Sequence, residues 1–380
     1  KALAQTSNLT LSTRLTPRLS EAWRPQEDHR MKTSLNLVAL AIELERQRTA
    51  KQDYIASPSA LAVTPDAKHL TLNNGTIHQF SIRDGAHAQL AVRLEIPKRH
   101  YDRMLAEAPE LLATTANRWL SGSKNRLMVR VMDGSVRALL SDRYQRIEND
   151  DVAEIALPIL ADQPDMRIVS AAITESRMYI KAVFPRIQGE VRKGDIVKSG
   201  VVISNSETGN GTVSVTPLNY RLICLNGMIV PDARFGGFQI GRAAGEGESV
   251  YEMPSDEAKR ADDKAILLKV RDVVRNCASQ SCFDGVIQRM RESTTRMIMG
   301  DVVKAIETLS VKVRLNESER AGVLRHLITG ADVSKYGLIQ AVTLTSQDVE
   351  DYDRATELEA LGGWLLSLPP TDWQQIAEAA

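Results

Sequence analysis

The chain has 380 residues, of which 43% are hydrophobic and 25% are charged, and its formal net charge at pH 7 is zero. This composition is ordinary for a soluble globular protein of two or three domains, and it carries no global basic signature of nucleic-acid binding. Three cysteines argue against a disulfide scaffold and fit a reducing, cytoplasmic compartment. No run of about 18 apolar residues is present, so we expect no membrane span.

The first segment, residues 1–33, is polar and is interrupted by Pro17 and Pro25. Its basic residues are Arg14, Arg18, Arg24, Arg30 and Lys32. We interpret this segment as a flexible basic arm, which is either a partner-docking segment or a solvated tail. Residues 35–48 fit a helix or a strand, and residues 51–65 look irregular.

The next region predicts hairpins separated by helices. Two pairs of strands carry turn residues typical of β-hairpins: residues 70–72 and 77–82 around Asn73-Asn74-Gly75, and residues 127–132 and 136–140 around Asp133-Gly134. Residues 89–96 fit one more strand. Helices are predicted to begin at Pro97 and Pro109, with Trp119 in the apolar stripe of the second, and a further helix is predicted to be capped by Asn149.

The densest β signal runs from residue 167 to residue 231. Residues 166–185 predict a hairpin that turns at Glu175-Ser176, and further strands are expected at residues 196–204 and 211–216. In the hairpin, four apolar side chains alternate with Arg177, Tyr179 and Lys181, which would project together from the opposite sheet face. Gly209 and Gly211 are expected to adopt backbone angles that a β-carbon disfavours.

Beyond Gly247 the pattern becomes helical. Ser255 is expected to cap a long helix, and Asn316 and Glu319 have the spacing of a capping box. The other predicted helices are residues 284–311, the helix that ends at Gly330, residues 346–368 and residues 372–379. The sequence therefore predicts an α+β protein with a basic arm (1–33), a β-rich, nucleic-acid-binding core with an antiparallel, hairpin-rich sheet (34–250), and a helical C-terminal region (251–380).

Signals for catalysis are weak. The histidines and cysteines lack metal-ligand spacing, the glycines do not form a dinucleotide fingerprint, and neither a P-loop nor a nucleophile elbow is present. A metal-dependent nuclease would need convergent carboxylates, but Asp150, Asp151 and Glu154 are explained by a helix start, where acidic residues are favoured. We therefore expect no enzyme activity, no metal and no cofactor.

A basic β surface is the better candidate, because arginine and lysine neutralise phosphates and tyrosine can stack on a base. The candidate nucleic-acid-binding residues are Arg126, Arg130, Arg137, Arg143, Arg177, Tyr179, Lys181 and Arg221. The alternative is an ordinary solvated sheet face. Arg221, on an apolar strand, is expected either to reach a phosphate or to pair with an acid, for which Glu207 is the expected partner.

The C-terminal end is acidic. From residue 348 to residue 378 the sequence holds eight carboxylates and the single basic residue Arg354. The acidic helix from Asp348 to Glu359 would repel phosphate. We therefore expect it to dock on the basic surface of a neighbouring subunit or to screen the binding groove in the free state.

Three segments resemble a known family: Arg137-Ala138-Leu139-Leu140-Ser141-Asp142-Arg143-Tyr144, Asn205-Ser206-Glu207-Thr208-Gly209, and Arg221-Leu222-Ile223-Cys224-Leu225-Asn226-Gly227-Met228. In this order, and over the chain from about residue 111 onward, they resemble the phage- and plasmid-borne family known as domain of unknown function 932. That family has no established catalytic residues, so the resemblance assigns none to this chain. Its members are similar to genes on mobile elements near replication and recombination functions. The hairpins followed by helices are more distantly similar to single-strand annealing proteins of the Redβ, RecT and Erf kind.

The resemblance implies binding and annealing of single-stranded DNA during recombination or replication of a phage or plasmid. The expected partners are single-stranded DNA, further copies of the chain in a ring or filament, and host or phage recombination proteins. The alternative is a host-interaction or counter-defence protein that binds a protein partner without DNA chemistry, with the acidic C-terminal helix as its contact surface.

Overall fold

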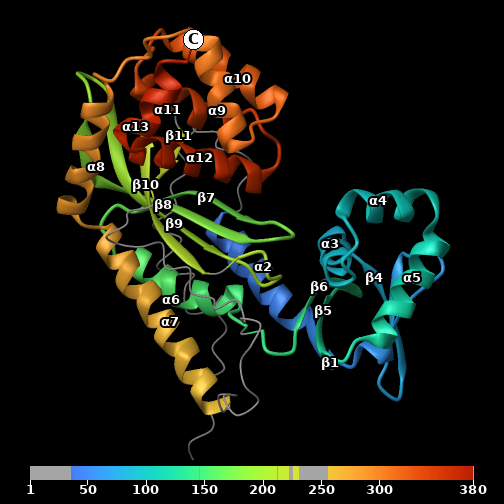
Figure 1. Ribbon diagram of the computed structural model, residues 1–380. Helices are drawn as coiled ribbons and strands as arrows, with labels where there is room; N and C mark the ends of the chain where they lie inside the picture. The colour runs from blue at the N-terminus through green and yellow to red at the C-terminus, as the bar shows by residue number, and fades with distance from the viewer. Residues whose placement is uncertain (1–35, 145, 212, 222–225, 231–255, 380) are drawn as a thin grey trace, which may run out of the picture.

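The computed structural model describes residues 36–379 apart from residues 145, 212, 222–225 and 231–255. It confirms the predicted α+β class. A small lobe holds a six-stranded sheet, and a large lobe holds a five-stranded sheet together with the C-terminal helices (Figure 1). The basic arm, Ser255 and Cys224 lie outside the described residues. No helix of the described residues is long and apolar enough to cross a membrane.

The sheet of the small lobe has the strand order β1-β5-β6-β4-β3-β2, and all its pairs are antiparallel except β4 with β6. Its strands are β1 (Lys51–Ala56), β2 (Leu61–Val63), β3 (His69–Asn73), β4 (Ile77–Ile82), β5 (Leu127–Met132) and β6 (Ser135–Ser141). Helices α3 (Asp84–Arg93), α4 (Lys98–Glu107) and α5 (Pro109–Gly122) pack on this sheet. Leu90, Tyr101 and Leu112 from these helices share a core with Val129 of β5.

Both predicted hairpins of this lobe are confirmed. Asp133 and Gly134 have φ angles of 52° and 72°, which is the left-handed pair that a tight two-residue turn requires. Two other predictions for the lobe are wrong. Residues 51–65 form β1 and β2, because pairing with β5 and β3 supplies the ladder that the local pattern lacks. Residues 89–96 belong largely to α3, whose buried Ala86 and Leu90 are four residues apart.

The sheet of the large lobe is antiparallel throughout, with the strand order β11-β10-β9-β8-β7. Its strands are β7 (Arg167–Ile173), β8 (Met178–Glu190), β9 (Ile196–Asn205), β10 (Ser214–Arg221) and β11 (Asn226–Ile229). Helices α2 (Leu37–Ala50), α6 (Asn149–Ala161) and α7 (Asp256–Cys277) share a core with one face, which includes Ile180 and Phe184. The opposite face carries Tyr179, Val183 and Val202.

The C-terminal helices are α8 (Gln280–Ser293), α9 (Val302–Val313), α10 (Glu317–Gly330), α11 (Lys335–Thr345), α12 (Tyr352–Ser367) and α13 (Pro370–Ala377). The capping box of Asn316 and Glu319 is confirmed at the start of α10. The single helix predicted for residues 284–311 is wrong, because Asp301 caps a new helix by accepting from the amides of Val303 and Lys304. Helix α11, which the sequence pattern did not reveal, is buried along almost its whole length.

Helix α6 begins one residue earlier than the predicted cap implies. Glu148 is its N-cap residue, and Asn149 is already its first helical residue. The Asn149 side chain accepts a hydrogen bond from the Asn205 amide at 2.9 Å instead of capping its own helix. The start of α6 is therefore tied to the turn that follows β9.

Lys335 is a buried cation at the start of α11, with 1% of its surface exposed. Its Nζ donates to the carbonyl oxygens of Leu366 and Leu368 at 3.3 Å, and no described carboxylate pairs with it. Burial and the nearby Arg296 lower its pKa to about 8 from 10.5. The unfolded chain therefore binds more protons between these two pH values, so the free energy of unfolding rises with pH across that window.

We expect Lys335→Met to raise the free energy of unfolding at pH 7 by about 1–3 kcal/mol, because it removes a buried charge that has no carboxylate partner. The gain should shrink as the pH rises toward 10. Urea denaturation at several pH values measures both effects, with Lys304→Met at an exposed position of α9 as the control. A less stable Lys335→Met protein at pH 7 would show that the two carbonyl contacts outweigh the cost of burial.

Candidate functional site at the junction of the two lobes

Glu207 joins the two lobes from the turn between β9 and β10. Its carboxylate accepts from Lys51 Nζ and from Arg137 Nη1, both at 2.5 Å, and from the Asn149 amide at 2.7 Å. Lys51 begins β1 and Arg137 lies in β6, so both cations belong to the small lobe. Glu207 itself is 3% exposed, and its charge is therefore neutralised by protein groups instead of water.

Arg130 of β5 extends this contact. Its Nε donates to Asp53 at 2.9 Å, its Nη1 donates to the backbone oxygen of Glu207 at 2.8 Å, and its Nη2 pairs with Glu148. Lys51 also donates to Glu148 and Asp150 at 3.1 and 3.2 Å, and Arg146 pairs with Asp53 at 3.0 Å. We call these groups the junction network: Lys51, Asp53, Arg130, Arg137, Arg146, Glu148, Asp150 and Glu207. Its cations and carboxylates are equal in number.

The electrostatics of the junction network follow from burial and pairing. Burial disfavours ionisation of Glu207, but Lys51 and Arg137 outweigh it and lower the pKa of Glu207 to about 2. Burial and the neighbouring Glu207 raise the pKa of Glu148 above its ordinary value. Burial opposes the charge of Lys51, yet Glu207 and Glu148 raise its pKa. The network thus holds a firmly ionised Glu207 beside a carboxyl group that gains protons more readily.

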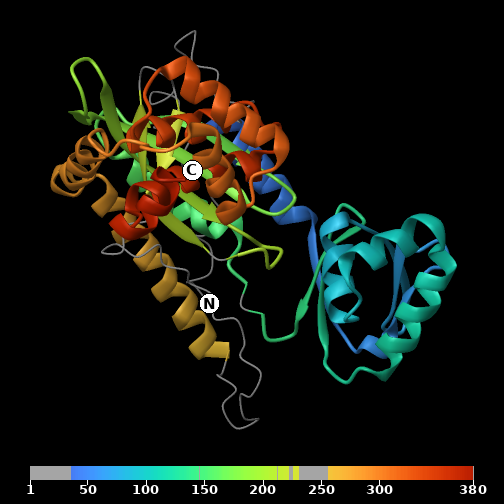
Figure 2. The same cartoon turned by 45° about the horizontal axis from the view of Figure 1, so that its top comes forward.

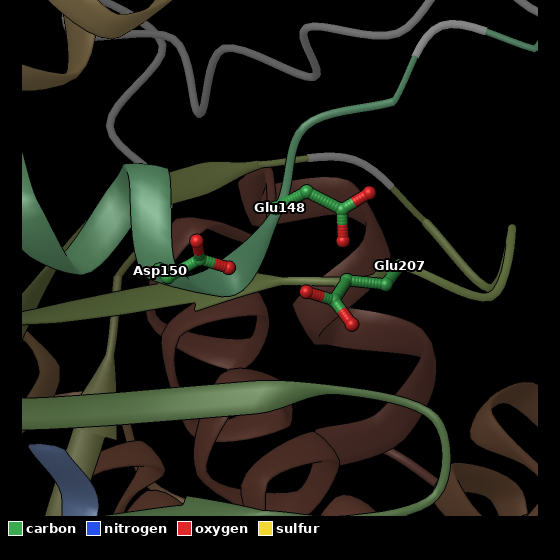
Figure 3. A group of neighbouring side chains, drawn as sticks. All are labelled: Glu148, Asp150 and Glu207. Atoms are coloured by element: carbon green, nitrogen blue, oxygen red, sulfur yellow. The ribbon is translucent and has the colours of Figure 1, made fainter. Parts of the chain in front are cut away.

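Three of these carboxylates lie close enough together to suggest a metal site. Oxygen atoms of Glu148, Asp150 and Glu207 lie within 4.8 Å of one another, and Figure 3 shows the Glu148 and Glu207 carboxylates facing each other. Hard divalent cations prefer such oxygen ligands. The Lys51 ammonium, however, is within 3.2 Å of an oxygen of each carboxylate, so a metal ion would have to displace it. Asp151 and Glu154, the other acidic residues considered from sequence, are exposed on α6.

The first two segments that carry the family resemblance meet in this part of the molecule. Arg137 and Tyr144 of the first segment contact Glu207 and Ser206 of the second, the latter through the Tyr144 hydroxyl at 3.3 Å from the Ser206 carbonyl oxygen. Gly209 has a φ of 78°, and a β-carbon there would lie 2.6 Å from the Leu140 side chain. The positive φ expected for this glycine is confirmed, and the second segment is shaped for contact with the first.

The third segment fixes the C-terminal helices to the sheet. Its Asn226 donates to Thr343 at 2.5 Å and to Gln340 at 3.3 Å, both on α11. Residues 222–225 lie outside the described residues. Arg221 pairs with an acid, as one of the two alternatives predicted, but the expected partner Glu207 is wrong. Asp195 accepts from Arg221 Nε at 2.6 Å and from Nη2 at 3.0 Å, because it directly precedes the strand that pairs with β10.

The predicted binding face of the β7–β8 hairpin is covered by helix α12. Lys181 is 2% exposed, and its Nζ donates to Glu359 at 2.6 Å and to Thr356 at 3.0 Å. The Tyr179 ring is packed on Tyr352, with ring centroids 5.3 Å apart. The expected exposure of this face is therefore wrong, because the acidic helix of the same chain neutralises it. Arg177 is half-buried and donates to the Asn210 carbonyl oxygen.

The remaining candidate arginines separate into two groups. Arg130 and Arg137 are buried in the junction network, with 1% and 6% of their surfaces exposed. Arg126 and Arg143 are exposed. Arg126 precedes β5, whereas Arg130 lies within this strand, on the side that meets the large lobe.

A second surface of the small lobe was missed by sequence reasoning. A groove of about 480 Å³ is lined by Arg93, Leu94, Glu95, Trp119, Leu120, Ser123, Asn125 and Leu127, and we call it the Trp119 groove. Trp119 is 48% exposed, although its place in the helical pattern predicted a core position. The exposed residues Arg118, Lys124 and Arg126 flank the groove in sequence and pair with no described carboxylate. The acid-free run from residue 118 to residue 126 was the available signal.

The fold and the junction network define a two-lobed α+β protein whose lobes are joined by buried ion pairs. The family model described as "Domain of unknown function (DUF932)" matches residues 137–255. This match confirms the predicted resemblance, over a shorter stretch than the one expected from residue 111 onward. The similarity to single-strand annealing proteins is not confirmed. No curated protein and no solved structure matches the chain.

Proposed function

We propose that the chain binds single-stranded DNA at the Trp119 groove of the small lobe. The observation that carries this proposal is an exposed tryptophan on the wall of a groove, with exposed cations beside the lining residues in sequence that form no salt bridge to described residues. An aromatic ring offers a stacking surface for any base, and nearby cations neutralise the phosphates. This combination is typical of proteins that bind single strands without sequence preference.

The cations near the groove support this assignment over the hairpin face predicted from sequence. Arg118, Lys124 and Arg126 are exposed and free of salt bridges to described residues, so phosphate contacts would not first require breaking an ion pair. Lys181, in contrast, would have to lose its buried partner Glu359. Glu95 is the single carboxylate in the groove lining, and it sets a limit on how closely a phosphate approaches that side.

Annealing makes a further demand, because two strands must be held until they pair. Several copies of the chain side by side would supply that, so the proposal includes a homo-oligomer on a phage or plasmid replication or recombination substrate. The junction network then sets the orientation of the small lobe on the large lobe.

We expect Trp119→Ala to weaken binding of a fluorescent oligothymidylate about tenfold, since stacking of one base contributes about 1–3 kcal/mol. The combined Arg118→Ala, Lys124→Ala and Arg126→Ala variant should flatten the salt dependence by about 0.7 per lost contact. Fluorescence anisotropy at several salt concentrations measures both effects. Trp364→Ala is the matched control, because Trp364 is 37% exposed on α12 in the large lobe.

Unchanged affinity and salt slope in both groove variants would remove the Trp119 groove from the site. Salt-insensitive capture of a host protein, with no DNA binding by the unaltered chain, would favour the alternative of a protein-binding role. Metal-dependent cleavage of the oligonucleotide that is lost in Glu148→Gln would instead favour a nuclease at the junction carboxylates. Sizing of the chain with and without DNA tests the expected oligomer.

A further inference from the structure

A cavity of about 410 Å³ lies where the two lobes meet, next to the junction network. Arg83 and Arg137 line it from the small lobe, and Ser176, Asn210 and Asp353 are among the residues that line it from the large lobe. Because both lobes contribute to this lining, we call it the junction cavity. Figures 1 and 2 show the turns after β7 and β9 reaching toward the small lobe. The volume of the junction cavity falls within the range of small-molecule sites, about 300–1,000 Å³.

Arg137 has donors that the described part of the chain leaves unused. Its side chain is 5% exposed, and Nη1 donates to Glu207 at 2.5 Å. Its Nε and Nη2 are buried and donate to no described atom, although Nη2 lies 3.9 Å from Glu148 Oε2. Buried guanidinium donors are normally satisfied, because leaving them without an acceptor is unfavourable. Two such donors on a cavity-lining arginine indicate an anionic acceptor supplied from outside the chain.

Arg83 provides a second positive charge in the same lining. It is half-buried, and the hydrogen bond of its side chain within the described residues is a long one, from Nη2 to the Met132 carbonyl oxygen at 3.5 Å. No described carboxylate forms a salt bridge with it. Its charge is therefore available to a ligand, and together with Arg137 it gives the small-lobe side of the cavity the chemistry of a phosphate site.

The large-lobe side has the opposite character. Asp353 accepts from Thr174 at 3.1 Å and from Ser176, and Asp351 caps α12 by accepting from the Arg354 amide at 2.7 Å. The N-terminus of α12 is therefore capped by the Asp351 carboxylate, so its backbone amides are not the group that would bind the anion. Glu175 completes an acidic wall, whose oxygens suit hydroxyl or amino donors on a ligand.

We propose that the junction cavity binds a nucleotide, with its phosphate at Arg83 and Arg137 and its sugar or base donors toward the acidic wall. A phosphate ester with hydroxyl groups matches both sides of the lining, whereas inorganic phosphate matches only one. The nucleotide comes either from free solution or from the 5′ end of a strand. The proposal rests on the cavity and not on the Trp119 groove, so either can fail without the other.

Isothermal titration calorimetry with AMP, adenosine and inorganic phosphate tests this. AMP should bind, and both fragments should bind at least tenfold more weakly. Arg83→Gln should weaken AMP binding at least tenfold, because it removes the accessible charge. Arg137→Lys should do the same, because it keeps a charge beside Glu207 but removes the unused Nε and Nη2 donors. Thermal unfolding without ligand establishes that both variants fold.

Trp119→Ala and Arg126→Gln are the matched controls, and both should bind AMP as the unaltered chain does. A 5′-phosphorylated oligothymidylate that binds more tightly than its 5′-hydroxyl counterpart, with the difference lost in Arg83→Gln, would identify the strand end as the source. If the two oligonucleotides bind with equal affinity while AMP binds tightly, the ligand of the cavity is a free nucleotide. Failure of the unaltered chain to bind AMP at millimolar concentration, or equal AMP affinity in Arg83→Gln, would overturn the proposal.

Discussion

Replacing Glu207 by glutamine is expected to lower the free energy of unfolding at pH 7 by about 3 kcal/mol, because it leaves buried Lys51 and Arg137 with too little negative charge. Glu207 is 3% exposed and lies 2.5 Å from a nitrogen of each cation. Because glutamine has nearly the same shape as glutamate, the lower free energy of unfolding would be due to the lost charge and not to a change in side-chain volume. Urea denaturation of the full chain measures it.

The pH dependence gives a second readout of the same substitution. The folded pKa of Glu207 is about 2 and its ordinary value is 4.5, so its contribution is present above pH 4.5 and is lost as the pH falls toward 2. The difference between the unaltered chain and Glu207→Gln should therefore shrink over that window. Glu154→Gln, at an exposed carboxylate of α6, is the control and should change stability little. A Glu207→Gln protein as stable as the unaltered chain would show that the junction network contributes nothing to folding.

Replacing Gly363 by alanine is expected to destabilise the protein by about 3 kcal/mol or more, because the added carbon meets backbone that cannot move aside. A β-carbon at this position would lie 1.9 Å from the Ile229 carbonyl oxygen and 2.7 Å from the Val230 Cα. Helix α12 therefore packs on β11 only where the helix has no side chain. Forcing α12 away would also stretch the buried pair of Lys181 and Glu359.

Gly285→Ala is the matched control for this helix position. Gly285 lies inside α8, and a β-carbon there has nothing within 4 Å. Alanine should stabilise that helix by about 0.5–1 kcal/mol through its better helix propensity. Urea denaturation followed by tryptophan fluorescence compares the two variants. Equal stability of Gly363→Ala and the unaltered chain would mean that α12 does not need its close approach to β11.

The three segments that carry the family resemblance lie at contacts between elements of the fold. The first two meet at the junction network, and the third fixes α11 to the sheet. Residues of these segments thus join elements that are distant in sequence. Arg137 differs from the other residues of these segments. Its Nη1 neutralises Glu207, whereas its Nε and Nη2 have no acceptor among the described residues and could bind a ligand.

Local signals in the sequence determined much of the backbone. Asp133-Gly134 predicted a hairpin because both residues tolerate positive φ, and Asn316 with Glu319 predicted a helix start because their side chains satisfy local amides. The positive φ of Gly209 was equally visible. Each of these features depends on neighbours within a few residues, so the chain alone is enough to indicate them.

Only the tertiary structure decided which charged side chains are accessible. Lys181 is neutralised by Glu359, which lies 178 residues further along the chain, and Arg137 is neutralised by Glu207, 70 residues away. Strand alternation correctly placed Tyr179 and Lys181 on one face, but it carries no information about α12 covering that face. Trp119 shows the converse, since its helical spacing fits a core position and yet the described residues leave it 48% exposed. Burial of a charge depends on where distant segments come to lie, and the local pattern of the chain does not contain that.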